Sequence, residues 1–423
     1  MAMRILLLST TTGYQLRSFN DAAERAGVDI LFGTDRCWNL DDPWQDRAIP
    51  VRFHEESRSL DAVLRAARER PIDGVIAVGD RPVVLAARVA TTLRLPGNPP
   101  DAAAASASKL ETRRRLAAAG MPVPWFVRVP LAKDRTADAT GLRVPFPCVV
   151  KPLGLSGSRG VIRADSPDEL KAAVDRVARL LARPQVRTIR SGLEDEMLIE
   201  AFIDGREFAI EGVVTAGGLR VFAIFDKPDP LDGPFFEETI YVTPSDLPPP
   251  TRDEIAREVQ RAVTALGLVH APIHAECRVG PSGITLLEVA ARPIGGLCSR
   301  ILRFEPGCAP LEEVLLRHAL GGDTSAFARE SQAAGVMMIP IPKRGVFRRA
   351  DGEEDALGVD LVEQISITAK RDQLLEPLPE GASYLGFIFA RGPGRAAVVG
   401  ALREAHRRLR FAIDPAIDVG PAP

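Results

Sequence analysis

The first hundred residues alternate between continuous apolar runs, typical of buried strands, and segments with apolar positions at helical spacing. Strands that alternate with helices form βαβ units, so we predict an open parallel α/β sheet with right-handed connections. The predicted elements are strands 4–9, 28–32 and 72–78 and helices 16–26, 60–70 and 82–93.

Proline-rich stretches divide the rest of the chain. Pro96-Gly97-Asn98-Pro99-Pro100 marks a first boundary, and a triple proline at 248–250 precedes a further predicted helix. The apolar patterns between and after these breaks predict helices 106–119, 252–266 and 394–408, strands within 126–151 and 196–230, and strands 335–341 and 386–390. We therefore predict an N-terminal α/β domain (1–100), a lid region (101–195), a core (196–330) and a small C-terminal α+β module (331–423).

Glu276 and Glu288 are the most informative pair of residues. Each lies in a segment predicted as a short strand, and Gly280-Pro281-Ser282-Gly283 between the segments predicts a tight turn. An antiparallel hairpin brings facing side chains to one surface. Two carboxylates placed there repel each other unless a cation separates them, and hard oxygen ligands suit Mg²⁺, which usually keeps substrate phosphates among its other ligands. The hairpin is a candidate floor for a metal and a nucleotide.

Composition and charge narrow the class of protein without naming it. The chain has 423 residues, 46% hydrophobic and 26% charged, as in an ordinary globular protein, and a length that suits about three domains. The net charge of −2 gives no electrostatic reason to expect nucleic acid. Apolar runs are too short to span a membrane and no secretory signal is evident, so we expect a cytoplasmic protein. Five scattered cysteines imply no disulfide framework or zinc site; they are Cys37, Cys148, Cys277, Cys298 and Cys308.

A lysine followed by a glycine-rich loop is the second chemical signal. Lys151 ends an apolar strand, and the segment Gly154-Leu155-Ser156-Gly157-Ser158-Arg159-Gly160 follows it directly. Such a loop exposes backbone N–H groups that can cover phosphates, while the lysine supplies a point charge. The lysine precedes the glycines, so this is not a Walker A motif. Taken alone, the loop would be interpreted as a plain hairpin.

Other polar residues have simpler interpretations. The segment 198–207 leads into a turn and could meet a nucleotide through Glu200 or Glu207, although a surface hairpin with solvated acids is the simpler alternative. Asp80 follows a strand end, where a turn or capping role competes with a place in a ligand crevice. Three arginines at 113–115 are interpreted as a solvated helix face, and His270 and His274 as structural.

Taken together, these stretches resemble the ATP-grasp superfamily, in its carboxylate–amine ligase and biotin-carboxylase-like branches. The matching parts are Ser106–Lys109, Ala119–Pro124, the Lys151 strand with its loop, Ile199–Glu207 and Glu276–Gly296, all in one order. The resemblance implies an ATP-grasp fold: an N-terminal parallel domain, central ATP-grasp domains and a small C-terminal module.

The resemblance also implies a role for each matching residue. Lys109 and Lys151 correspond to the lysines that bind nucleotide phosphates, and Glu276 and Glu288 to the Mg²⁺ ligands, with Mn²⁺ as a substitute. Arg292 corresponds to the arginine that steadies acyl-phosphate oxygens. The remaining ATP-binding positions are the loop residues Gly154, Ser156, Gly157, Ser158 and Gly160, the adenine segment Glu200, Ala201, Phe202 and Ile203, and the ribose acid Glu207.

Two positions depart from the pattern or extend it. Many members carry Asn two residues after the second metal carboxylate, where this chain has Ala290, so one metal ligand is absent or replaced by water. Residues 235–244 resemble the substrate-side loop of amino-acid ligases. Glu238 keeps the acid of that loop, while Tyr241 stands where a histidine is frequent. Lys227 is a further candidate for the same pocket.

The resulting prediction is an ATP- and Mg²⁺-dependent ligase. It would join a carboxylate, here an amino acid, to an amine through an acyl phosphate and release ADP and phosphate. The partners would be small-molecule carboxylate and amine substrates, with no nucleic acid or membrane, and the resemblance implies a homodimer. Three alternatives remain: a bicarbonate-activating carboxylase of the biotin-carboxylase or purine-pathway type, a catalytically silent ATP-binding regulatory protein, and a plain structural assembly protein that ATP would not stabilise.

Overall fold

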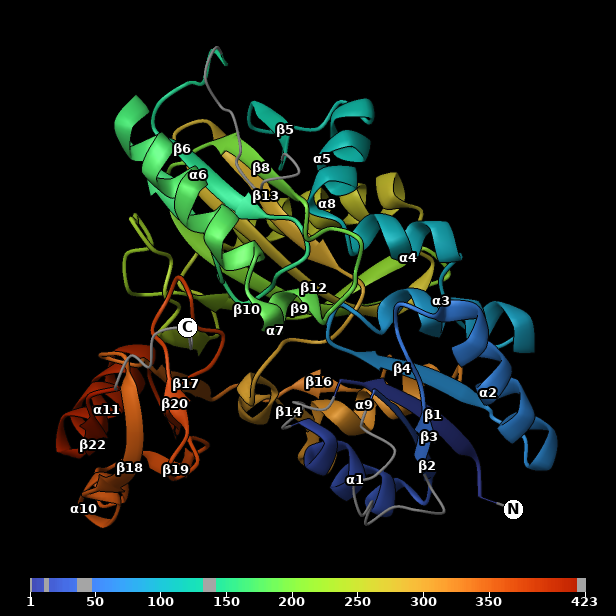
Figure 1. Cartoon of the computed structure of the whole chain (residues 1–423). Coiled ribbons are helices and arrows are strands. Elements are labelled where there is room, and N and C mark those ends of the chain that lie inside the picture. The colour runs from blue at the N-terminus through green and yellow to red at the C-terminus, as the bar shows by residue number, and fades with distance from the viewer. Residues whose placement is uncertain (1, 11–14, 36–47, 132–141, 417–423) are drawn as a thin grey trace.

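The N-terminal domain is the parallel α/β unit that the sequence pattern predicts. The computed structural model describes residues 2–10, 15–35, 48–131 and 142–416. Four parallel strands lie in the order β3-β2-β1-β4, and Figure 1 shows them at one end of the molecule. The elements are β1 (Arg4–Ser9), α1 (Gln15–Ala26), β2 (Asp29–Thr34), β3 (Ala48–Pro50), α2 (Glu56–Glu69), β4 (Gly74–Val78) and α3 (Val83–Leu93).

Two short helices connect this domain to the rest of the chain. Helix α4 (Pro100–Ser106) begins at the proline cluster that the sequence marks as a boundary, with Pro100 in its first turn, where a missing N–H costs nothing. Helix α5 (Lys109–Ala118) follows, and the Ser108 side chain accepts a hydrogen bond from Glu111 N as its N-cap. Helix α5 confirms the predicted helix 106–119 with a later start, because Ala107 and Ser108 separate it from α4.

A separate four-stranded antiparallel sheet forms the lid. Its order is β5-β8-β6-β7, helix α6 packs on β6 and β7, and the short helix α7 contacts α6. The glycine-rich loop joins β6 to β7 as the connection of an antiparallel pair. The bounds are β5 (Phe126–Pro130), β6 (Cys148–Pro152), β7 (Ile162–Ala164), α6 (Pro167–Leu181), α7 (Pro184–Arg187) and β8 (Glu196–Ala201).

One eight-stranded sheet runs through both the core and the C-terminal module. Its order is β13-β12-β9-β10-β11-β17-β21-β19, so strands on both sides of residue 330 are neighbours in one sheet. Helix α8 (Pro249–Leu266) packs on its core half. The bounds are β9 (Arg206–Thr215), β10 (Gly218–Asp226), β11 (Ile240–Thr243), β12 (His270–Gly280), β13 (Gly283–Ala290), β17 (Ala333–Ile339), β19 (Val362–Ile367) and β21 (Gly386–Gly392).

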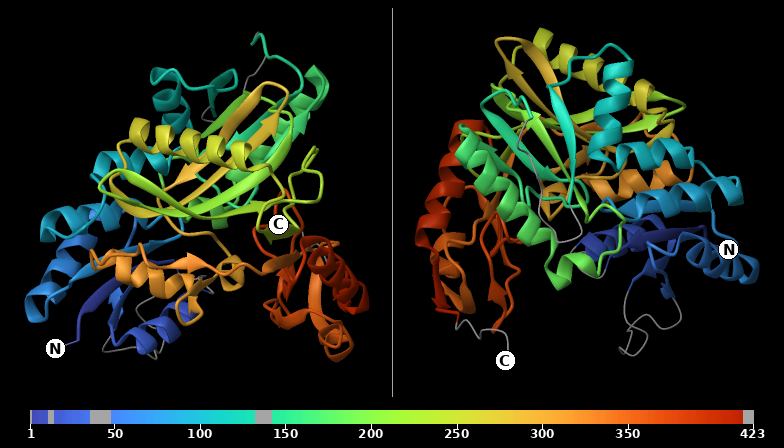
Figure 2. Two further views of the ribbon diagram at one scale, coloured as in Figure 1. Left: turned by 180° about the vertical axis from the view of Figure 1, so that it is seen from behind. Right: turned by 45° about the horizontal axis from the view of Figure 1, so that its top comes forward.

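The rest of the C-terminal module is built around strands β17 and β21. Helix α11 (Arg395–Arg408) packs on both strands, and a small three-stranded sheet lies in the order β20-β18-β22. The two views of Figure 2 show this module, orange to red, next to the lid. The other elements are β18 (Gly345–Asp351), α10 (Glu353–Leu357), β20 (Leu374–Leu375) and β22 (Arg410–Asp414).

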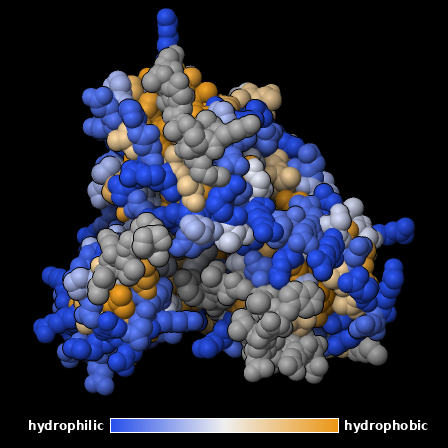
Figure 3. Space-filling model, in the orientation of Figure 1, coloured by the Kyte–Doolittle hydropathy of each residue, from blue (hydrophilic) through white to orange (hydrophobic). Residues whose placement is uncertain are grey.

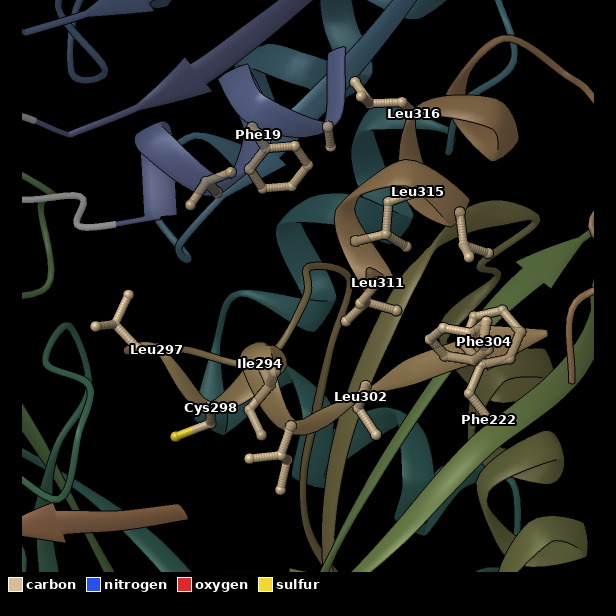
Figure 4. Packing of buried hydrophobic residues seen from close by; sticks show 14 of the residues in the cluster. Phe19, Phe222, Ile294, Leu297, Cys298, Leu302, Phe304, Leu311, Leu315 and Leu316 are labelled. Atoms are coloured by element: carbon tan, nitrogen blue, oxygen red, sulfur yellow. The ribbon is translucent and has the colours of Figure 1, made fainter. Parts of the chain in front are cut away.

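The segment between the core and the C-terminal module packs against the N-terminal domain. It comprises η1 (Cys298–Ile301), β14 (Arg303–Glu305), β15 (Ala309–Pro310), α9 (Leu311–Ala319) and β16 (Ala328–Arg329). Figure 4 shows Leu315 and Leu316 of α9 beside Phe19 of α1, within one buried cluster. In the same cluster, Phe222 and Phe304 lie edge to face with ring centroids 5.1 Å apart. This packing fixes the N-terminal sheet against the core.

Polar residues predominate on the part of the face that Figure 3 colours by hydropathy, with smaller apolar areas between them. Within the described residues, no helix is both long and apolar enough to cross a membrane. Cys148, Cys277, Cys298 and Cys308 are free thiols, and Cys37 lies outside the described residues. The predicted absence of a disulfide framework holds for these four.

Candidate functional site

The carboxylate hairpin has the predicted geometry. Strands β12 and β13 are antiparallel, Gly280 pairs with Gly283 across a two-residue turn, and Glu276 pairs directly with Glu288. Cross-strand partners project to the same face of a sheet, so the two carboxylates share one surface. A register shift follows Glu276, which offsets the remainder of the ladder by one residue.

Arg292 and Asp80 close one side of this surface. Arg292 Nε donates a 2.7 Å hydrogen bond to Asp80 Oδ1, and its Nη2 lies 3.6 Å from Glu288 Oε1. Burial opposes the charge of Asp80, but Arg292 outweighs it and lowers the pKa of that carboxyl. Asp80 comes from the turn after β4, so the N-terminal sheet contributes directly to the site. The turn role holds for its backbone, since Asp80 O accepts from Val83 N.

Lys227 occupies the centre of a buried cluster of carboxylates. Its Nζ donates to Glu207 at 2.7 Å, Glu238 at 2.5 Å and Glu276 at 2.8 Å, and the side chain is only 3% exposed. Burial disfavours the charge of Lys227, yet the three acids outweigh it and raise its pKa well above the ordinary value. Burial and the repulsion from its acidic neighbours raise the pKa of Glu238 to about 7 despite Lys227. The cluster joins three residues that the sequence assigns to ribose, substrate and metal.

His274 connects this cluster to a second buried acid. His274 Nδ1 lies 3.2 Å from Glu211 Oε2, and Nε2 lies 3.6 Å from Glu276 Oε1. Burial opposes the charged imidazole, but hydrogen bonds to Glu211 and Glu276 raise the pKa of His274 to about 9. Glu211 also accepts from Ile294 N, and so it positions the backbone just after Arg292. The structural interpretation of His274 is consistent with these contacts.

A third buried cluster lies under the lid. Glu200 of β8 accepts hydrogen bonds from Arg113 at 3.0 and 3.4 Å and also pairs with Lys151 of β6. Arg113 further donates to Leu286 O of β13, at 3.2 Å. Burial would raise the pKa of Glu200, but Arg113 and Lys151 outweigh it and lower it to about 2. The interpretation of Arg113 as a solvated residue is wrong: it is 2% exposed and joins helix, lid and core.

The glycine-rich loop is held by Lys109 and packs against the end of β6. Lys109 begins α5, and its Nζ donates a 2.7 Å hydrogen bond to Leu155 O inside the loop. Gly157, Ser158 and Gly160 all have positive φ, which only glycine adopts without strain. A side chain at Gly160 would also meet Pro152 Cγ at 2.6 Å. The loop is therefore a tight turn against β6.

The predicted adenine segment, 200–203, begins in the last two residues of β8 and leads toward β9. Ala201 N donates to Trp125 O, Phe202 N donates to Pro147 O, and Ile203 O accepts from Arg278 at 2.8 Å. Arg278 Nε also donates to Glu207 at 3.0 Å, so one arginine braces both this turn and the ribose acid. Arg278 is 3% exposed. No sequence argument singled it out.

The donor set at the hairpin fits a hard divalent cation. Glu276 and Glu288 offer carboxylate oxygens, the ligands that Mg²⁺ prefers. Burial alone would raise the pKa of Glu276, but Lys227 and His274 keep it well below the ordinary value, so the group is an anion. Among the described residues, the acids with ligand atoms all within 4.8 Å of one another are instead Glu207, Glu238 and Glu276. The ammonium of Lys227 already lies among those three.

Family models match three parts of the chain. An ATP-grasp domain model matches residues 144–301, an ATP-grasp N-terminal domain model residues 20–97, and an L-amino acid ligase C-terminal domain 2 model residues 337–414. The chain belongs to the ATP-grasp superfamily. Within this superfamily, the protein is an L-amino acid ligase-like enzyme that binds ATP.

Similar proteins cover most of this ATP-grasp chain. The crystal structure of L-amino acid ligase from Bacillus licheniformis matches with a TM-score of 0.81 and 28% identity, over 97% of this chain and 99% of that one. The ATP-grasp enzyme fsqD of Aspergillus fumigatus is 26% identical over 93% of this chain and 76% of its own length. Carnosine synthase 1 of Gallus gallus is 30% identical over 59% of this chain but only 27% of its own.

Several site residues had little or no sequence signal. Asp80 and Glu211 lie far along the chain from Arg292 and Ile294, which they contact, and only the packed sheets bring them together. Glu211 lies in the apolar run of β9, where a charged residue that is fully buried is rare unless paired. That mismatch was the available signal. The catalytic, ATP-binding and metal roles of the sequence-predicted residues stay predictions.

Proposed function

We propose that this chain activates the carboxylate of an amino acid with ATP and joins it to an amine, forming an amide or peptide bond and releasing ADP and phosphate. The class of activity, an ATP-grasp amino-acid ligase that forms an amide bond, follows from the family matches and the ligase-like structure. The proposal extends to the order of steps, the metal and the residues that act.

The placement of Glu238 is the observation that carries the choice of substrate. Glu238, Glu207 and Glu276 form an acidic cluster around the buried Lys227, and Glu276 is also one of the two proposed metal ligands. An α-ammonium group would find a carboxylate partner there, since buried charges need opposite charges nearby. Bicarbonate is an anion without an ammonium and gains nothing from an added acid. This argues for an amino acid over the bicarbonate-activating alternative.

The chain's own residues then divide the chemistry. Lys109 donates to a carbonyl of the glycine-rich loop and Lys151 lies in the strand before it, and their charges would bind phosphate oxygens. A carboxylate oxygen attacks the γ-phosphorus and ADP leaves. Arg292, held by Asp80, would donate to the oxygens of the resulting acyl phosphate. The amine nitrogen then attacks the carbonyl carbon, phosphate leaves and the nitrogen loses a proton.

Glu276 and Glu288 would hold Mg²⁺. When bound, this ion neutralises charge that develops on the phosphate oxygens during transfer. Neither step needs a nucleophilic side chain, because positioning and exclusion of water supply most of the rate. Because water must be excluded from the site, it matters whether the lid is open or closed. A homodimer remains an expectation from the resemblance.

A phosphate-release screen of amino-acid pairs tests the proposal. We expect ATP- and Mg²⁺-dependent phosphate release with a subset of pairs, and a product whose mass equals the two amino acids minus water. ADP release that needs bicarbonate and no amino acid would favour the carboxylase instead. Binding of ATP without turnover by any pair would favour the silent regulatory alternative.

A further inference from the structure

A short loop of the C-terminal module contacts the lid at several points. Residues 376–381, here the 376–381 loop, follow β20, whose Leu375 is buried in the module. Gly381 N donates to Pro377 O within the loop. A side chain at Gly381 would collide with Glu376 O, so the turn is compact. The 376–381 loop is thus a compact turn that projects from the C-terminal module.

Two of its contacts reach the glycine-rich loop itself. Gly160 N donates to Pro379 O at 2.8 Å, and Arg159 Nε donates to Glu380 O at 2.9 Å. Both acceptors are backbone carbonyls of the 376–381 loop. The glycine-rich loop, which is proposed to cover the phosphates, is therefore hydrogen-bonded to the C-terminal module as well as to the lid that carries it.

Side-chain pairs attach the same loop to the lid helices. Arg176 of α6 donates to both carboxylate oxygens of Glu380, at 2.6 and 2.9 Å, a bidentate geometry that makes a strong, oriented pair. Arg183 donates to Glu376 at 2.8 Å. Burial would raise the pKa of Glu380, but the hydrogen bond and charge of Arg176 outweigh it and lower it. The carboxylate is therefore in its paired, ionised form.

Arg176 also faces the proposed substrate loop. Its guanidinium lies 4.9 Å from the centroid of the Phe235 ring, a cation–π distance. Beside it, Arg163 N donates to Pro234 O at 2.9 Å. One lid arginine therefore contacts the C-terminal module on one side and the segment leading to Glu238 on the other.

We propose that Glu380 is a positioning residue that holds the lid and its glycine-rich loop closed while the acyl phosphate exists. The inference rests on the proposed function, because an acyl phosphate exposed to water is hydrolysed before an amine can reach it. Glu380 is not proposed to contact any reacting atom. It acts through Arg176, and the backbone beside it acts on Arg159 and Gly160.

Trypsin tests the closed state without requiring turnover. The Arg159–Gly160 bond is a tryptic site that the 376–381 loop holds on both sides. In the full-length protein, we expect Glu380→Ala and Arg176→Ala each to raise the rate of cleavage after Arg159 roughly fivefold, as for loss of one exposed ion pair. The double variant should match the single ones, because both remove the same contact. Mass spectrometry of the fragment that begins at Gly160 gives the rate.

A control variant separates the lid contact from the module's stability. Asp414→Ala removes the exposed Arg348–Asp414 pair, which lies between β18 and β22 and does not touch the lid. We expect no change in cleavage after Arg159 for this variant. Thermal unfolding of all variants should match the wild type. Unchanged cleavage in Glu380→Ala, or effects that multiply in the double variant, would overturn the proposal.

The ratio of phosphate to amide product provides the catalytic readout. Wild type should release one phosphate per amide, whereas Glu380→Ala should release an excess because water intercepts the intermediate. A ratio unchanged from wild type would contradict the inference. If wild type forms no amide with any pair, the proposed function fails, while the cleavage rates still show whether Glu380 keeps the loop closed.

Discussion

Asp80 accepts a 2.7 Å hydrogen bond from Arg292, and this contact joins the N-terminal sheet to the end of the carboxylate hairpin. Asp80→Asn keeps the shape but removes the charge that orients the guanidinium. We expect kcat/KM for ligation to fall about 10- to 100-fold, corresponding to about 1–3 kcal/mol. Steady-state kinetics would show it. Asp101→Asn, which alters an exposed pair with Arg115, serves as the control. Equal rates for the two variants would remove Asp80 from the site.

Glu288→Ala should abolish ADP formation and leave the fold intact. Glu288 is 31% exposed at its side chain and lies on the surface shared with Glu276, so its loss removes a proposed metal ligand without opening the core. Coupled-enzyme detection of ADP measures the effect, and circular dichroism checks the fold. Glu258→Ala, on α8 in a pair with Arg261 one turn away, is a matched acidic substitution. Normal turnover in Glu288→Ala would contradict the metal assignment.

Lys151→Ala should weaken ATP binding. The ammonium of Lys151 would pair with phosphate oxygens of ATP. Its removal would leave the negative charge of those oxygens without this partner. We expect the dissociation constant for ATP, measured by calorimetry, to rise roughly tenfold, or about 1.4 kcal/mol. Lys171→Ala removes a lid lysine that is 74% exposed and pairs only locally with Asp175. The same affinity in both variants would exclude Lys151 from the nucleotide site.

Acid should destabilise the protein partly through Glu200. Its pKa in the folded state is about 2, below the ordinary value of 4.5, so its contribution to stability is present above about pH 4.5 and is lost as the pH falls toward 2. That shift predicts a loss of about 2 kcal/mol between pH 6 and pH 3. Denaturant unfolding at each pH would show a flatter dependence for Glu200→Gln. Parallel curves for wild type and variant would refute the contribution.

Glu238→Gln should raise the KM for the amino-acid substrate more than the KM for ATP. The change removes the negative charge proposed to meet the α-ammonium, while Lys227 keeps Glu207 and Glu276 as partners. A tenfold effect on the amino-acid KM corresponds to about 1.4 kcal/mol. Titrating each substrate separately distinguishes the two constants. Proportional increases in both would place Glu238 outside the substrate pocket.

Local sequence patterns were sufficient where neighbours in space are also neighbours in sequence. The hairpin follows from its two-residue turn, and the parallel sheet follows from βαβ order. The direct pairing of Glu276 with Glu288 also requires the register shift after Glu276, because a regular ladder from Gly280–Gly283 would place Glu276 opposite Leu287. Helix α6 was not predicted, although Ser166-Pro167 is a usable start signal; Ser166 caps Glu169 N.

Contacts between distant segments could not be predicted in this way. The burial of Arg113 depends on Glu200 and on a carbonyl of β13, which a helix pattern does not reveal. In the same way, Asp80 acquires its partner only when the N-terminal sheet packs against the core. Polar residues of this kind look solvated in sequence because their counter-charge lies many residues away.

The continuous eight-stranded sheet makes the C-terminal module inseparable from the catalytic core. Strand β11 pairs with β17 through four residue pairs from Ile240–Met337 to Thr243–Ala334. A chain truncated after residue 330 would leave the β11 edge with unpaired backbone groups, a template for aggregation. Engineers seeking a minimal ligase should therefore transplant or shorten peripheral loops of this module and retain its two central strands.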